Sequence, residues 1–253
     1  MRFRIVVKGI PLFTYLKGMP SFLKEYSEIR CKARKPEENF PFGPFYPCLE
    51  DRYQESGNAT GHYFHQDLLV ANRIFVNNPI RHVDIGSRID GLVAHVASFR
   101  EIKVLDIRDL TSHAPNILFQ RADLMDPDFA LTDHCDSASC LHALEHFGLG
   151  RYGDRIDYRG HLTGWENIHR MLQRGGKFYF SVPIGAQRIE FNAHRVFSMA
   201  YLLALIEGRY HQDAFSFVDD AGNLIRDPEM TGESVRNNFG CHYGCGIFEL
   251  TKR

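Results

Sequence analysis

The chain has 253 residues, of which 24% are charged and 44% hydrophobic, a composition typical of one globular α/β domain with an ample core. Its formal net charge of −1 at pH 7 argues against nucleic-acid binding, which needs a broad basic surface. The six cysteines have no C-x-x-C spacing, and no apolar run reaches the length of a signal peptide or membrane span, so we expect reduced thiols in a cytoplasmic protein.

The first 60 residues are predicted to form a basic, aromatic and Pro-rich extension that precedes a domain over residues 61–253. Within the first 35 positions, nine Lys and Arg residues face only Glu25 and Glu28. Such a segment is able to attach weakly to the anionic inner face of a membrane, and the alternative is that it packs on the core. The Pro and Gly residues of 40–47 exclude regular structure there and mark the boundary.

Strand and helix patterns alternate along the rest of the chain. Asp67 is a candidate N-cap for a helix that ends near Asn78. The alternation predicts a parallel sheet with right-handed crossovers. The predicted strands are 82–86, 102–106, 117–121, 136–141, 177–182, 214–218 and 246–250, and the further predicted helices are 91–99 and 161–173.

The segment 83–91 carries the strongest functional signal. A β-branched run enters Asp84, Gly86 permits a tight turn, and a second carboxylate, Asp106, follows 22 residues after the first. A βαβ unit builds a nucleotide-shaped pocket in this way, with the second carboxylate accepting hydrogen bonds from ribose hydroxyls. Because Arg88 breaks the G-x-G-x-x-G spacing that admits a pyrophosphate, we expect an adenosyl ligand without phosphates.

These segments resemble the class I S-adenosylmethionine-dependent methyltransferases, whose first motif is matched by Asp84 and Gly86 but not by the positions that follow. The matches continue in residues 121–124, 136–142 and 170–183, where the family has its adenine-contacting segment, fourth strand and fifth strand. The resemblance implies an α/β fold with a seven-stranded, mostly parallel sheet, an antiparallel last strand and helices on both faces. The cofactor-binding residues that it implies are Asp84, Gly86, Ser87, Arg88, Asp106, Ile107, Asp123, Leu124 and Ser139.

A narrower resemblance covers roughly residues 60–253. The segments HVDIGSRIDG (82–91) and LHALEHFGLGRYGD (141–154) resemble a group of methyltransferase-like proteins of unassigned function found in nematodes and bacteria. This likeness names no substrate.

The pentapeptide His-Ala-Leu-Glu-His supports two interpretations. In a methyltransferase it faces the methyl donor, where His146 would act as general base, Glu145 would orient the imidazole or bind a sugar hydroxyl, and His142 would do either. On a helix, the same H-x-x-E-H pattern puts two imidazoles one turn apart with a carboxylate beside them, as in zinc hydrolases. The structural alternatives are that His142 caps a strand and that Glu145 pairs with Arg151 or Arg155.

The loop 148–160 is polar and rich in Gly, so it is able to close over a polyhydroxylated acceptor. Loop carboxylates with Glu145 are able to recruit Mg²⁺, but no fixed spacing supports this. The segment from Cys241 to Cys245 is able to supply metal ligands. Because the sequence identifies no further ligands for a zinc ion there, we expect this segment to form a bend and not a metal site. The predicted substrate-binding residues are Arg151, Asp154, Asp157 and His194.

Together these patterns predict an S-adenosylmethionine-dependent methyltransferase that methylates an oxygen of a sugar or another small polar acceptor, such as an envelope glycan in polysaccharide biosynthesis. A different class of function is a binding protein that keeps the fold but has lost catalysis. Arg88 discriminates between the two. A side chain that fills the methionine pocket would exclude the cofactor, and one that points outward would not.

Overall fold

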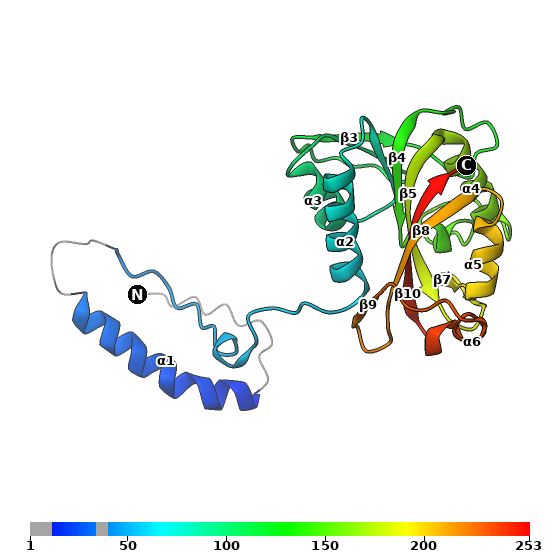
Figure 1. The fold of residues 1–253 in the computed structure, drawn as a ribbon. Coiled ribbons are helices and arrows are strands. Elements are labelled where there is room, and N and C mark those ends of the chain that lie inside the picture. Colours follow the sequence, from blue (N-terminus) through cyan, green and yellow to red (C-terminus); the bar gives the residue numbers. More distant parts are fainter. Residues whose placement is uncertain (1–11, 34–39) are drawn as a thin grey trace. The chain divides into compact units, whose positions relative to one another are not determined.

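The computed structural model describes residues 12–33 and 40–253 of the chain. They belong to two compact units, divided after Asn58, and Figure 1 draws both as ribbons. Among the described residues, no helix has the length and apolar character that crossing a membrane requires.

The first unit is built on α1 (Leu12–Lys32) and the short 3-10 turn η1 (Asp51–Tyr53). Tyr26 of α1 meets Phe45 edge-on with ring centroids 4.6 Å apart, so the Pro-rich segment is held on the helix by aromatic packing. The predicted basic segment is described only in part. Five of its basic residues lie outside the described residues: Arg2, Arg4, Lys8, Arg34 and Lys35.

An eight-stranded sheet with the order β3-β2-β1-β4-β5-β10-β8-β9 forms the centre of the second unit. Strands β1 to β5 are parallel, and β10 lies antiparallel between β5 and β8. This confirms the predicted mostly parallel sheet with its antiparallel last strand, to which β9 adds a short edge strand. The strands are β1 (His82–Ile85), β2 (Ile102–Asp106), β3 (Ile117–Arg121), β4 (Cys135–Leu141), β5 (Leu172–Ile184), β8 (Tyr210–Val218), β9 (Leu224–Arg226) and β10 (Gly244–Lys252).

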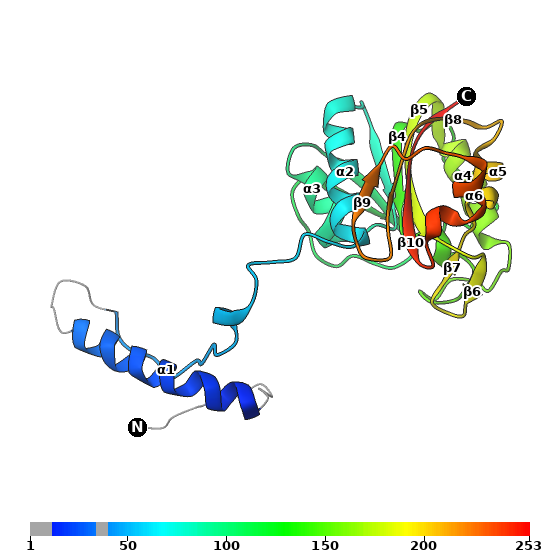
Figure 2. The ribbon, with the colours of Figure 1, turned by 60° about the horizontal axis from the view of Figure 1, so that its bottom comes forward.

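Helices cover both faces of this sheet, with α2 and α3 on one side and α4 and α5 on the other (Figures 1 and 2). On the first face, Ile74 of α2 belongs to one buried cluster with Val104 of β2. On the second, the Trp165 ring of α4 lies 5.1 Å from that of Phe180. The helices and turns are α2 (His62–Asn77), η2 (Ile89–Val93), α3 (Ala94–Ala97), η3 (Leu144–His146), α4 (Gly160–Met171), α5 (Met199–Ile206), α6 (Gly232–Arg236) and η4 (Asn238–Gly240), and β6 (Arg188–Glu190) pairs with β7 (His194–Val196) in a separate hairpin.

Element bounds differ from the prediction where tertiary contacts outweigh local signals. The helix assigned to a cap at Asp67 begins earlier, at His62, and Asp67 lies buried inside it, where burial raises the pKa of its carboxyl to about 6. The helix predicted over 91–99 lies two residues earlier in the chain, as a π-helical turn, η2, that leads into α3 and ends at Ala97. The predicted bounds of β2 and β3 are confirmed. The three-residue strands β6, β7 and β9 were not predicted, because segments so short show no hydrophobic period.

A buried chain of hydrogen bonds joins β1 to β4. His82 contacts the hydroxyls of Ser137 and Ser139 at 2.8 and 3.1 Å, and burial lowers the pKa of His82 to about 3, so the ring is neutral. Ser139 donates to the carboxylate of Asp84 at 2.6 Å. Ser87 donates both its N–H and its hydroxyl to the same carboxylate, at 3.0 and 2.7 Å. These bonds fix the turn after β1 against the neighbouring strand.

Burial at this position predicts a specific pH dependence of stability. It raises the pKa of Asp84 to about 6 from an ordinary 3.8, so between these values the folded protein keeps a proton that the unfolded chain releases. The contribution of Asp84 to the free energy of unfolding therefore falls as pH rises, by roughly 3 kcal/mol from pH 4 to above pH 6. Urea unfolding of the wild type and of Asp84→Asn across this pH range measures the effect. The free energy of unfolding of the wild type is expected to fall relative to that of Asp84→Asn as pH rises, and a difference that stays constant with pH would contradict the prediction.

Candidate functional site

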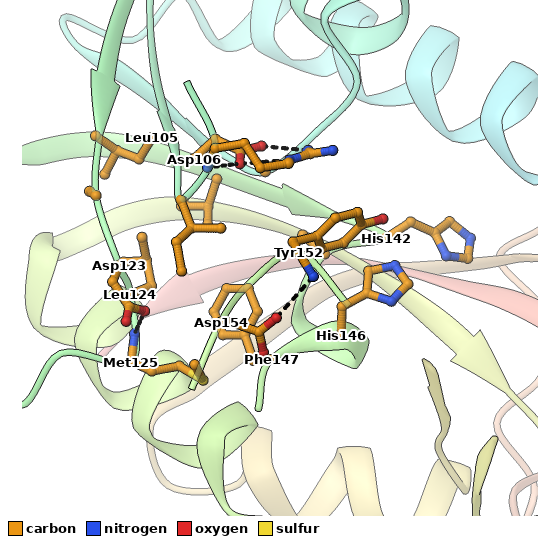
Figure 3. Close-up of a pocket in the computed structure, with 16 residues that line it drawn as sticks. Leu105, Asp106, Asp123, Leu124, Met125, His142, His146, Phe147, Tyr152 and Asp154 are labelled. Carbon is orange, nitrogen blue, oxygen red and sulfur yellow. Dashed lines mark hydrogen bonds and ion pairs between the residues drawn. The ribbon is translucent and has the colours of Figure 1, made fainter. Parts of the chain in front are cut away.

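The strand order reverses between β1 and β4, and a pocket lies at the carboxyl ends of the strands there. Figure 3 shows His142 and His146 at one end of this pocket and Asp123, Leu124 and Met125 at the other. The walls between them are largely apolar. The lining residues are Ile85, Gly86, Leu105, Asp106, Ile107, Arg108, Ala122, Asp123, Leu124, Met125, His142, Ala143, His146, Phe147, Tyr152 and Asp154.

The turn after β1 forms the floor of the pocket. Gly86 has φ +67°, and a Cβ there would lie 2.9 Å from that of Ala143, so only glycine fits without strain. Asp84 and Ser139, both predicted to bind cofactor, are completely buried and do not line the pocket. Asp84 holds the turn from behind by accepting two hydrogen bonds from Ser87, and Ser139 supports Asp84 by donating to its carboxylate. The first motif therefore shapes the pocket through its backbone.

Asp106 lies at the end of β2 and faces the pocket, as predicted from its position, but its carboxylate is paired. It accepts the backbone N–H of Arg108 at 2.8 Å and two guanidinium N–H groups at 3.0 and 2.7 Å. The same guanidinium lies 4.3 Å from the ring centroid of Tyr152. Sequence reasoning missed Arg108 and Tyr152, although an arginine two residues after a candidate ribose-binding acid is a visible signal.

Arg88 points away from the pocket. Its side chain is 55% exposed, pairs with Asp90 at 2.8 Å, and lies 5.2 Å from the ring centroid of Tyr63. With Ser87 it lines a separate depression beside the pocket. Arg88 therefore does not fill the place where the methionine part of a cofactor is expected.

Residues 142–146 do not form the helix that an H-x-x-E-H zinc site requires. His142 has φ +50°, and only a 3-10 turn, η3, follows it. Glu145, which is 1% exposed, pairs with neither Arg151 nor Arg155. Its carboxylate lies 2.7 Å from His142 Nδ1 and 3.8 Å from His146 Nε2, between the two imidazoles.

The protonation of this group follows from its partners. Burial opposes ionisation of Glu145, but the neighbouring imidazoles outweigh burial and lower its pKa. His146 Nδ1 lies 2.7 Å from the Ala193 carbonyl, and because a carbonyl only accepts, Nδ1 carries the proton and Nε2 keeps its lone pair. Burial lowers the pKa of His146, so its imidazole is neutral at pH 7. The pocket therefore has a free imidazole base at one end.

The loop 148–160 is more tightly held than its composition suggests. Asp154 accepts the N–H groups of Gly148 and Gly150, at 2.8 and 3.1 Å, and lines the edge of the pocket. Arg195 of β7 is buried and donates to backbone carbonyls on both sides of the loop, Phe147 at 2.6 Å and Tyr158 at 3.1 Å. Aromatic rings at Phe147 and Tyr152 complete the wall.

The other predicted substrate-binding residues lie outside the pocket. Arg151 donates to the Ala193 carbonyl at 3.0 Å, and Asp157 accepts the N–H of Arg159. His194 lies 3.0 Å from Glu190 in the β6–β7 hairpin. The structure thus brings only Asp154 of this set to the pocket.

Three solved structures illustrate the similarity of the fold. The [4+2]-cyclase SpnF matches with a TM-score of 0.52 at 14% identity over 74% of this chain and 80% of its own. The YcgJ protein of Bacillus subtilis matches with a TM-score of 0.51 at 15% identity over 75% of this chain and 98% of its own. A 1,6-didemethyltoxoflavin-N1-methyltransferase of Burkholderia thailandensis, solved with S-adenosylhomocysteine, matches with a TM-score of 0.50 at 13% identity over 98% of this chain and 93% of its own. Identities this low show a shared fold, and the cyclase shows that the fold alone does not determine the reaction.

Sequence comparison gives the family. No curated protein is similar to this chain. A family model described as "Caenorhabditis protein of unknown function, DUF268" matches residues 103–236, just over half of the chain. The matched region runs from β2 through the pocket-lining segments to α6. The chain has the fold of the class I S-adenosylmethionine-dependent methyltransferases and belongs to the DUF268 family.

Proposed function

We propose that this protein binds S-adenosylmethionine in the pocket at the ends of β1, β2 and β4 and transfers its methyl group to an oxygen of a small polar acceptor such as a sugar. The observation that carries the proposal is the placement of a carboxylate, Asp106, and a neutral imidazole base, His146, on one pocket at the point where the strand order reverses. The fold neighbour with bound S-adenosylhomocysteine supports the cofactor.

The residues present fit the adenosyl part of this cofactor. Leu124, Met125 and Phe147 give apolar walls that suit a flat purine. Asp106 would accept the ribose hydroxyls, and the close turn at Gly86 leaves room beside the backbone. A carboxylate has about four lone-pair positions, of which Arg108 occupies three. Binding both hydroxyls therefore requires the Arg108 guanidinium, half-exposed in this structure, to leave Asp106.

The bound cofactor supplies an electrophilic methyl group, and the protein supplies position and a base. His146 Nε2 would take the proton of an acceptor hydroxyl, and Glu145 would stabilise the imidazolium that forms. An oxygen acceptor needs such a base because a neutral hydroxyl is a weak nucleophile. His142 also lines a second depression, with Tyr63, Asp220 and Tyr243. Its polar groups suit a polyhydroxylated acceptor, which supports a sugar.

The pairing of Arg108 with Asp106 favours a second candidate. If the guanidinium never leaves the carboxylate, the cofactor has no ribose partner and the protein is a binding module that keeps the methyltransferase fold. The outward position of Arg88 removes the other obstacle to cofactor binding.

Cofactor affinity distinguishes these two candidate functions. Asp106→Ala removes the acceptor of two ribose hydroxyls and is expected to weaken S-adenosylmethionine binding roughly 10- to 100-fold. Arg108→Ala, the matched control, leaves Asp106 in place and frees it, so affinity is retained or improved. Isothermal titration calorimetry measures both. If the wild type and Asp106→Ala bind S-adenosylmethionine with equal affinity, the cofactor site lies elsewhere. If neither the wild type nor Arg108→Ala binds S-adenosylmethionine, the protein is the binding module that has lost catalysis.

The rate of methyl transfer tests the role of His146 as general base. His146→Ala is expected to keep cofactor affinity within a few-fold while lowering the rate of methyl transfer roughly 10²- to 10⁴-fold. Formation of S-adenosylhomocysteine with a panel of sugars measures the rate, and His113→Ala, an exposed loop histidine that does not line the pocket, is the control. An unchanged rate in His146→Ala would exclude its role as base.

A further inference from the structure

Three soft or borderline metal ligands from distant parts of the second unit converge beside the pocket. His62 is the first residue of α2, His142 follows β4, and Cys245 lies in β10. One ring nitrogen of each histidine and the Cys245 sulfur lie within 4.8 Å of one another. We propose that these three residues bind a zinc ion, independently of any cofactor in the pocket.

His142 is prepared as a ligand. Its Nδ1 lies 2.7 Å from the Glu145 carboxylate, which only accepts, so Nδ1 carries a proton and Nε2 is the ring nitrogen left to bind a metal, with release of any proton that it holds. His142 is 7% exposed, and its Nε2 has no hydrogen-bond partner among the residues that the structure describes. A buried polar atom without a partner is costly, and a metal ion would satisfy it. A carboxylate that orients a histidine through its other nitrogen is the usual second shell of a zinc ligand.

The spacing of the two imidazoles agrees with a shared ion. Their ring centroids are 5.2 Å apart. Zn–N bonds of about 2.0–2.1 Å in tetrahedral geometry put the centroids of two ligating imidazoles about 5 Å apart and their ligand atoms roughly 3.3–3.6 Å apart. The two rings are nearly parallel, with an interplanar angle of 7°. A bound geometry therefore requires the ligand atoms to approach by about 1 Å and the imidazole rings to rotate so that their nitrogens face one ion.

Cys245 is able to release its proton without leaving an orphaned group. The thiol lies 3.6 Å from Gln66 Oε1 and is fully buried. Ser181 donates to the same Gln66 oxygen at 2.6 Å. When zinc displaces the thiol proton to solvent, Gln66 Oε1 therefore keeps a hydrogen-bond donor.

The ligand set selects the type of metal. Two imidazoles and a thiolate suit zinc, whereas Mg²⁺ and Ca²⁺ require oxygen ligands. Three protein ligands leave one position open. His62 and His142 border the open depression that Tyr63 and Tyr243 also line, so water or a ligand atom is able to reach this position, as in catalytic zinc sites.

This site differs from both metal interpretations of the sequence. In the segment 241–245 only Cys245 takes part, because Cys241 Sγ contacts the Phe239 carbonyl instead. In the H-x-x-E-H segment only His142 has a ligand atom in the cluster, and His146 is not part of it. The third ligand, His62, lies 80 residues before His142 in the chain.

Cobalt substitution tests the site directly. The full chain, purified under reducing conditions and freed of metal with a chelator, is titrated with Co²⁺ and then with Zn²⁺ in competition. We expect one ion per chain, a thiolate-to-cobalt charge-transfer band, and the d–d absorption of tetrahedral cobalt. His62→Ala and Cys245→Ser are expected to weaken binding more than about 100-fold. The matched controls Cys241→Ser and His65→Ala, one from the same segment and one from the same helix, bind as the wild type does.

Each outcome decides the proposal without reference to methyl transfer. Absence of the charge-transfer band in the wild type overturns it, as does a band that persists in Cys245→Ser or disappears in Cys241→Ser. His62 is only partly buried, so His62→Ala is expected to keep the wild-type circular dichroism spectrum even if Cys245→Ser unfolds. Calorimetry with S-adenosylmethionine on the same metal-free protein reports the cofactor site separately.

Discussion

The reversal of strand order between β1 and β4 is the constraint on which the rest of the site depends. Crossovers leave these two strands in opposite directions along the sheet, so no connection covers the crevice at their carboxyl ends. The buried hydrogen bonds from His82 through Ser139 to Asp84 hold the two strands in register there. The turn at Gly86 then lies under the pocket, and the segment after β4 forms its side.

Several charged groups around the crevice have charged or imidazole partners. Asp106 is paired with Arg108, Arg88 with Asp90, and Glu145 lies between two imidazoles. Partnered charges limit the desolvation cost of closely packed polar groups. If the proposed cofactor binds here, binding would be an exchange of partners, in which the ribose hydroxyls replace the Arg108 guanidinium at Asp106. Affinity would then depend on how readily Arg108 leaves, as well as on the contacts that the ligand gains.

His142 connects the two sites. Its ring lines the pocket at the ends of the strands on one side and borders the second depression on the other, and Glu145 links it to His146. A change in the charge at the proposed zinc site would shift the electrostatic potential at His146 through the shared carboxylate. This would couple the two proposed sites, because Glu145 is buried where interactions between charges are strong.

The sequence by itself determined the fold class, most strand positions, and the places of Gly86, Asp106 and His146 on one pocket, because hydrophobic period and turn chemistry act over a few residues. Only the tertiary structure decided that Asp84 and Ser139 support the turn from behind and that the Arg108 guanidinium pairs with the Asp106 carboxylate. It also brought His62 and Cys245 to His142. Such contacts depend on strand order and register, which place residues far apart in the chain side by side and leave no local pattern in the sequence.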